Sequence, residues 1–125
     1  MTTNPRRRTF EFRQLVSLVF QVLDVPAQAR PEEVPSPLSA RILETKDPSD
    51  ILGIPGWLIK TRTATSKDLS GALDEAQEAA EAAGVDHHAV VWKRQGRAAQ
   101  QSYVLLDLTT FGKVLHQLQK QSDTD

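Results

Sequence analysis

The stretch SDILGIPGWLIKTRT, residues 49–63, decides the fold because it has the pattern of a β-hairpin. Residues 51–54 and 57–63 are apolar and β-prone, and Pro55-Gly56 between them is a tight-turn signal. Asp50 stands immediately before the first of these strands. The stretch therefore predicts two antiparallel strands with a carboxylate at their entrance.

The chain before the hairpin predicts one helix and a long connection. Apolar residues at helical spacing indicate a helix over residues 10–23, and Pro26 is expected to end it. Residues 25–38 contain four prolines and few large apolar side chains, which favours a loop with extended character. Residues 40–45 are expected to form a short strand.

The chain after the hairpin predicts a helix, two strands and a last helix. Ser66 or Asp68 can cap the first of these helices and Gly84 can close it, with a buried stripe composed mostly of alanine. Residues 88–94 and 102–108 have strand patterns, and Thr109 or Thr110 is expected to cap the final helix. The resulting order, α-β-β-β-α-β-β-α, predicts an α/β (α+β) fold with a mixed β-sheet flanked by helices.

The length of 125 residues suits a single domain, which we place at residues 10–119. Residues 1–9 form a basic N-terminal arm with Arg6, Arg7 and Arg8, and residues 120–125 form a polar C-terminal tail. The net charge of −1 excludes a global attraction to nucleic acid or to an anionic membrane. The absence of cysteine excludes disulfides and thiolate metal sites. No apolar run approaches a membrane span of about 20 residues.

Several motifs, in this order, resemble the PD-(D/E)xK nuclease superfamily, and in particular short phage-encoded proteins similar to Holliday junction resolvases. The resemblance covers about residues 8–115. It rests on a glutamate in the first helix, a turn motif before the central strand, an alanine-rich helix and two later motifs. These are Glu11, SDILGIPG at 49–56, ALDEA at 72–76, KRQG at 93–96, and YVLLDL at 103–108 followed by Phe111.

The resemblance implies a nuclease-like core with a degenerate active site. In the active family an aspartate and a strand glutamate hold Mg²⁺, and a lysine two residues later assists the attacking water. Asp50 matches the aspartate, but Lys60 replaces the glutamate and Arg62 replaces the lysine. Glu11 and Gln77 match further positions near the family's site. All five positions are expected to be vestigial.

Charge is the reason to expect no metal and no catalysis. Two unit charges about 4 Å apart interact by roughly 4 kcal/mol at an effective dielectric near 20, and a divalent ion doubles that. Residues 60 and 62 share one strand face, so both cations would repel the ion. We therefore expect no cofactor, with Mg²⁺ needed only if the chain is a nuclease with a rearranged site. Asp50 is expected to pair with Lys60 or Arg62 or to cap the hairpin.

Other charged residues leave alternatives open. The triplet Glu44-Thr45-Lys46 could form a relocated site, although it precedes the aspartate, which is the wrong order for the fold. His87 and His88 are adjacent in a strand, so they should point to opposite faces and not share an ion. Arg6, Arg7, Arg8 and Arg13 could contact phosphate or an acidic partner protein.

The expected function is that of an inactive nuclease-like phage protein with a structural or binding role. A small fold with an arm at each end suits a ring subunit, so the expected setting is the head-to-tail connector of the virion. The expected partners are other phage proteins in an oligomer, with DNA contact left open, and the expected location is the virion after assembly in the host cytoplasm. The alternatives are a Holliday junction resolvase-like endonuclease with a rearranged site and a non-catalytic DNA-binding module. Cleavage of branched DNA and salt-dependent binding distinguish them.

Overall fold

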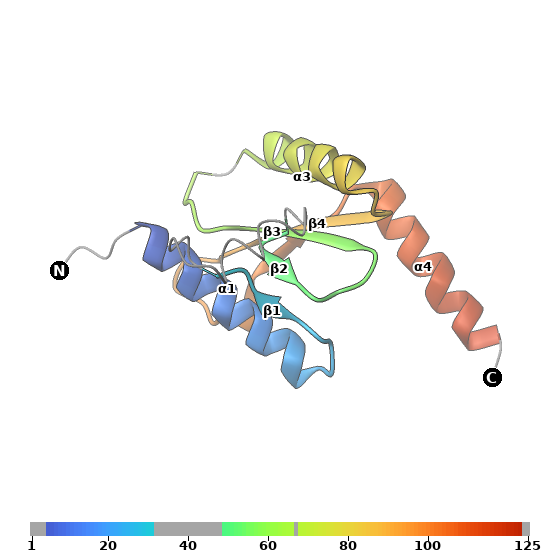
Figure 1. The fold of residues 1–125 in the computed structure, drawn as a ribbon, viewed down its shortest axis with the longest axis horizontal. Coiled ribbons are helices and arrows are strands. Elements are labelled where there is room, and N and C mark those ends of the chain that lie inside the picture. Colours follow the sequence, from blue (N-terminus) through green and yellow to red (C-terminus); the bar gives the residue numbers. More distant parts are fainter. Residues whose placement is uncertain (1–4, 32–48, 67, 124–125) are drawn as a thin grey trace.

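The structure is a computed structural model, and it describes residues 5–31, 49–66 and 68–123 (Figure 1). Its elements are α1 (Pro5–Val22), β1 (Gln28–Ala29), β2 (Ile51–Leu52), β3 (Trp57–Arg62), α3 (Leu69–Ala83), β4 (His87–Trp92), a 3-10 turn (Ala99–Gln101), β5 (Tyr103–Leu105) and α4 (Leu108–Asp123). The predicted α+β class, with a mixed sheet and helices, is confirmed. The first strand, however, is β1, in the stretch expected to be a loop. The strand expected at 40–45 lies outside the described residues.

The five strands form one mixed sheet in the order β1-β2-β3-β4-β5. β1, β2 and β3 pair antiparallel, and the predicted hairpin turns at Pro55-Gly56, where Gly56 has a φ of +78°. β3 and β4 pair in parallel over their whole length, with α3 as the connection between them. Parallel pairing brings the carboxyl ends of β3 and β4 to the same edge of the sheet. β5 returns antiparallel to β4.

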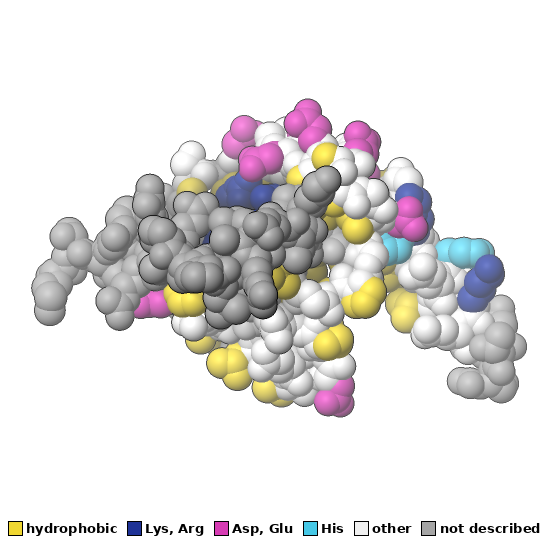
Figure 2. All heavy atoms as spheres, viewed as in Figure 1, with side chains coloured by type: hydrophobic (Ala, Val, Ile, Leu, Met, Phe, Trp, Pro, Cys, Tyr) yellow, Lys and Arg dark blue, Asp and Glu magenta, His cyan; other side chains and the backbone are white. Residues whose placement is uncertain are grey.

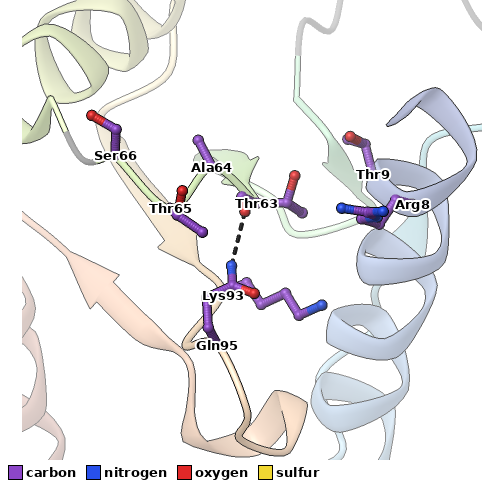
Figure 3. Close-up of a pocket in the computed structure, with 8 residues that line it drawn as sticks. All are labelled: Arg8, Thr9, Thr63, Ala64, Thr65, Ser66, Lys93 and Gln95. Atoms are coloured by element: carbon purple, nitrogen blue, oxygen red, sulfur yellow. Dashed lines mark hydrogen bonds between the residues drawn. The ribbon is translucent and has the colours of Figure 1, made fainter. Parts of the chain in front are cut away.

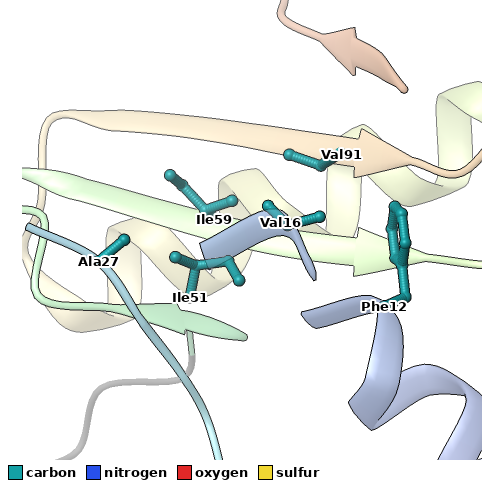
Figure 4. Close-up of a cluster of buried hydrophobic side chains, with 6 residues drawn as sticks. All are labelled: Phe12, Val16, Ala27, Ile51, Ile59 and Val91. Carbon is teal, nitrogen blue, oxygen red and sulfur yellow. The ribbon is translucent and has the colours of Figure 1, made fainter. Parts of the chain in front are cut away.

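One helix covers each face of the sheet, and each encloses a small core. On one face the side chains of α1 pack on β2, β3 and β4, in a cluster formed by Phe12, Val16, Ala27, Ile51, Ile59 and Val91 (Figure 4). On the other face, α3 contributes Ala72, Ala76 and Ala80 against Leu58, Val90 and Trp92. The alanine stripe predicted from the sequence is buried as expected. Small side chains let this helix lie close to the strands.

Helix α1 begins earlier than its apolar pattern indicates. The sequence predicts a start near residue 10 after a basic arm, whereas the helix begins at Pro5. Proline suits the first helical position because its missing N–H would be unpaired there. Arginine is a good helix former but gives no apolar periodicity, so the pattern could not reveal these turns. The backbone of residues 5–9 therefore belongs to helix α1.

Helix α1 ends in a left-handed turn at Asp24 and not at Pro26. Asp24 has a φ of +62°. Its backbone N–H donates to the carbonyl of Gln21, and the N–H of Val25 donates to that of Phe20. This is the Schellman arrangement, in which a glycine usually occupies the left-handed position.

The two later helices have side-chain caps, one as predicted and one not. The Asp68 carboxylate accepts from the N–H of Gly71 at the start of α3, and Gly84 closes that helix in the left-handed conformation. At α4 the cap is Asp107, which accepts from the N–H of Thr110 at 3.0 Å. The prediction of a threonine cap is therefore wrong, because α4 begins at Leu108 and Thr110 is buried within its first turn. α4 also continues to Asp123, through most of the predicted tail.

Candidate functional site

Asp50 stands at the start of β2 and is engaged by groups from α1 and β3. Its side chain is 8% exposed, and its Oδ1 lies 3.1 Å from Nη2 of Arg13. Its Oδ2 accepts from the backbone N–H of Thr61 at 2.8 Å and from the Thr61 hydroxyl at 3.2 Å. The Asp50 carboxylate therefore accepts hydrogen bonds from β3 directly before the point where β2 begins. Both oxygens of this carboxylate are already occupied by donors.

The partner of Asp50 differs from the expected one. The sequence predicts a pair with Lys60 or Arg62, but the ion pair is made by Arg13. The reason is strand alternation, because Thr61 shares the α1-facing side of β3 with Ile59 whereas Lys60 and Arg62 share the other side. The shared face of Lys60 and Arg62 is thus as predicted, but it is the face that α3 covers.

Arg62 finds its own acidic partner on α3. Its Nη2 lies 2.8 Å from Oε2 of Glu75, and its Nη1 donates to the carbonyl of Thr61. Figure 2 shows acidic side chains gathered over α3, with Lys or Arg side chains beside them. The Glu75 side chain is 61% exposed, so this pair contributes at most about 1 kcal/mol to stability. The contact orients the guanidinium but leaves it accessible.

A groove runs along the carboxyl-terminal half of β3 to the ends of β3 and β4. One part, with a volume of about 380 Å³, is lined by Thr9, Arg13, Asp50, Lys60, Thr61, Arg62, Thr63 and Ala64. The second part, of about 480 Å³, is lined by Arg8, Thr9, Thr63, Ala64, Thr65, Ser66, Lys93 and Gln95. The two parts share three of these residues and form one feature, which we call the groove.

In the second part of the groove, α1 stands on one side and the strand ends on the other (Figure 3). The side chain of Lys93 extends toward α1, on which Arg8 lies. Gln95 donates from Nε2 to the carbonyl of Thr63 at 3.0 Å and holds the two strand ends together. The backbone N–H of Lys93 donates to the carbonyl of Arg62, so parallel pairing places Lys93 beside the groove.

The groove is strongly cationic. Arg8, Arg13, Lys60, Arg62 and Lys93 line it, and Asp50 is the one carboxylate among the described lining residues. Arg13 and Arg62 have acidic partners, whereas no ion pair joins Arg8, Lys60 or Lys93 to another described residue. Thr9, Thr63, Thr65 and Ser66 add hydroxyl groups to the same lining. The arrangement offers many donors to an anionic ligand.

The described residues of the groove do not fit Mg²⁺. Mg²⁺ takes hard oxygen ligands and usually one or two carboxylates. The Asp50 carboxylate already forms an ion pair with Arg13 and accepts hydrogen bonds from Thr61, and Lys60 and Arg62 belong to the same lining. No group of three or more His, Cys, Asp or Glu side chains suited to a metal occurs in residues 5–31, 49–66 and 68–123.

The remaining predicted site residues lie apart from the groove. Glu11 and Gln77 are exposed on α1 and α3, and neither is among the described residues that line the groove. Gln77 is 3.4 Å from Glu81 on its own helix. The backbone of Arg6 and Arg7 lies in α1, and their side chains are outside the described part. The Glu44–Lys46 alternative also lies outside it.

The two adjacent histidines face opposite sides of the sheet, as predicted. The ring of His87 lies 4.8 Å from that of Trp57, on the α1 side. Nε2 of His88 lies 3.8 Å from Oδ1 of Asp107, near the start of α4. Both histidines are buried and serve separate contacts.

Sequence reasoning named Arg8, Arg13, Lys60 and Arg62 but missed Lys93 and the hydroxyl groups. Lys93 belongs to the KRQG motif, and the hydroxyls belong to the polar run after β3, so both signals were visible in the sequence. Comparisons with models of protein families, with curated proteins and with solved structures gave no match to this chain. The nuclease-like identity therefore stays a prediction. In the described part of the chain, no helix has the length and apolar character needed to cross a membrane.

Proposed function

We propose that the groove binds the phosphate backbone of nucleic acid without cleaving it. The observation on which this proposal rests is the lining itself, which contains five cationic side chains, several hydroxyls and one carboxylate that is already paired with Arg13. Arginine, lysine, serine and threonine are the side chains that make most contacts to phosphate oxygens. Their arrangement along an elongated groove suits a polymer of phosphates better than a single small anion.

The charge of the lining also explains why binding would proceed without hydrolysis. Phosphodiester cleavage by the nuclease superfamily that the sequence resembles needs a metal ion to polarise the phosphate and activate water. Asp50 already accepts from Arg13 and Thr61, and Lys60 lines the same part of the groove. A phosphate oxygen would be attracted by the groove that repels a divalent cation.

The expected setting, a subunit of the phage head-to-tail connector, remains part of this proposal. A protein that holds nucleic acid and leaves it intact suits such a position. The competing hypothesis, a Holliday junction resolvase-like endonuclease with a rearranged site, predicts cleavage instead. Incubation of duplex, single-stranded and four-way junction DNA with Mg²⁺ or Mn²⁺ should leave all three intact. Cleavage that is lost in Asp50→Ala and in EDTA would favour the endonuclease.

Binding is tested by fluorescence anisotropy with labelled duplex and single-stranded DNA. Lys93→Glu should weaken binding at least tenfold, because it replaces attraction of the phosphate by a lysine with repulsion of the phosphate by a carboxylate. Lys113→Glu is the matched control, since it changes the net charge equally but lies on the exposed side of α4. Equal loss of affinity in both variants would contradict binding in the groove. It would indicate a response to net charge alone.

A further inference from the structure

Helix α4 (Leu108–Asp123) carries an apolar stripe that the described fold leaves uncovered. In Figure 1 the helix extends away from the sheet toward the C-terminus. Leu108, Phe111, Leu115 and Leu118 are 85%, 46%, 43% and 57% exposed. Thr110, in its first turn, is 3% exposed, so the helix is fixed to the body mainly at its beginning. A contiguous exposed patch of large apolar side chains marks an interaction surface.

The spacing of the stripe suits pairing with a second copy of the same helix. The four residues follow one another at intervals of three, four and three positions, which is the spacing of the a and d positions of a coiled coil. These intervals are the same when the helix is read from either end. In an antiparallel pair of identical helices, Leu108 would therefore meet Leu118 of the other copy, and Phe111 would meet Leu115. Such a contact is isologous, as a two-fold axis requires.

The charges of α4 agree with self-association. Lys113 and Lys120 project from the side of the helix opposite the stripe, so two copies can approach without bringing their cations together. The flanking residues Gly112, Val114 and Gln119 carry no charge and set no repulsive barrier along the seam. The helix is about 24 Å long at 1.5 Å per residue, which gives an interface at the small end of specific contacts.

We propose that α4 pairs antiparallel with α4 of a second copy of this chain and makes the protein a homodimer. The pairing would cover the four exposed apolar side chains and stabilise a helix that is only marginally stable alone at this length. The proposal concerns a surface distinct from the groove and does not depend on nucleic-acid binding.

Light scattering coupled to size exclusion gives the first test on the full chain. The wild type should have twice the chain mass of 13.9 kDa at high protein concentration. Leu115→Glu should weaken the dimer at least tenfold, because an unpaired charge would be buried twice in the seam. Lys113→Glu, on the opposite side of the same helix, should remain dimeric. Circular dichroism at equal concentration checks that both variants keep the fold.

Disulfide trapping tests the antiparallel direction, and the absence of native cysteine makes the result unambiguous. A mixture of Phe111→Cys and Leu115→Cys chains should form the mixed disulfide in preference to either self-disulfide. A parallel pair would give the self-disulfides instead and would overturn the proposed geometry. A wild type that remains monomeric at all concentrations, or a dimer that persists in Leu115→Glu, would overturn the proposal.

Discussion

The contact between Arg13 and Asp50 should couple helix α1 to the sheet energetically. The Asp50 side chain is 8% exposed and that of Arg13 is 21% exposed, so the pair is mostly shielded from solvent. Removing one partner of a fully buried pair costs about 3–5 kcal/mol. Asp50 keeps two hydrogen bonds from Thr61 and Arg13 is partly exposed, so we expect about 2 kcal/mol for Arg13→Ala by the same reasoning.

A double-mutant cycle with Asp50→Asn isolates this interaction. The asparagine retains an oxygen that can accept from Thr61 but removes the charge that attracts Arg13. The double variant should be more stable than the sum of the two single effects by about 1–2 kcal/mol, within the range for residues in contact. Urea unfolding followed by tryptophan fluorescence gives the four free energies of unfolding.

Additive effects of the two single substitutions would refute this interaction. If the two effects add within about 0.5 kcal/mol, the guanidinium and the carboxylate do not interact appreciably. Asp50 would then lack the charge compensation that we assign to Arg13. Arg13→Lys provides a matched control, because it keeps the charge and loses the forked geometry, and it should lie between wild type and alanine.

Three further predictions concern the two helix ends and the core under α3. Asp24→Gly should raise the free energy of unfolding by up to about 1 kcal/mol in urea titrations, because glycine adopts the left-handed φ of +62° without strain; a loss of stability would refute that cause. The hydrogen bond from the Thr110 side chain, aided by its N–H and by His88, lowers the pKa of Asp107 below its usual value of 3.8. A lowered folded-state pKa adds stability above the unfolded pKa, and this contribution disappears as pH falls through the folded pKa. The stability difference between wild type and Asp107→Ala should therefore narrow as the pH is lowered through 3.8 and below, and a constant difference would contradict it. Ala76→Leu should lower the free energy of unfolding by about 1–3 kcal/mol, because Ala76 is fully buried between α3 and the sheet. Glu78→Leu on the same helix is the control and should change stability little, because Glu78 is exposed.

Local patterns were enough to predict most of the fold. The turn at Pro55-Gly56 and the alanine stripe of α3 each depend on residues close together in sequence, and both appear as predicted. The start of α1 was missed because arginines carry no apolar periodicity. The cap of α4 was misassigned because Asp107 and the two threonines are all good capping residues, and only tertiary burial of Thr110 decides among them.

The site was less predictable because its residues meet through tertiary pairing. The sequence showed that Lys60 and Arg62 share a face but not which helix covers that face. The partner of Asp50 comes from α1, some 37 positions earlier in the chain, and no local pattern connects it to β2. Lys93 reaches the groove only because β3 and β4 pair in parallel and end at the same edge.

The salt dependence of DNA binding tests the central proposal most directly. Arg8, Lys60 and Lys93 are the groove cations without an acidic partner among the described residues, and three phosphate contacts give a slope of log K against log salt of about −2.7 for duplex DNA. Affinity should then fall roughly 40-fold between about 50 and 200 mM salt. Lys93→Gln should reduce the slope by about one, and Lys113→Gln should leave it unchanged. A slope that is near zero, or that is the same in wild type and Lys93→Gln, would contradict phosphate binding in the groove.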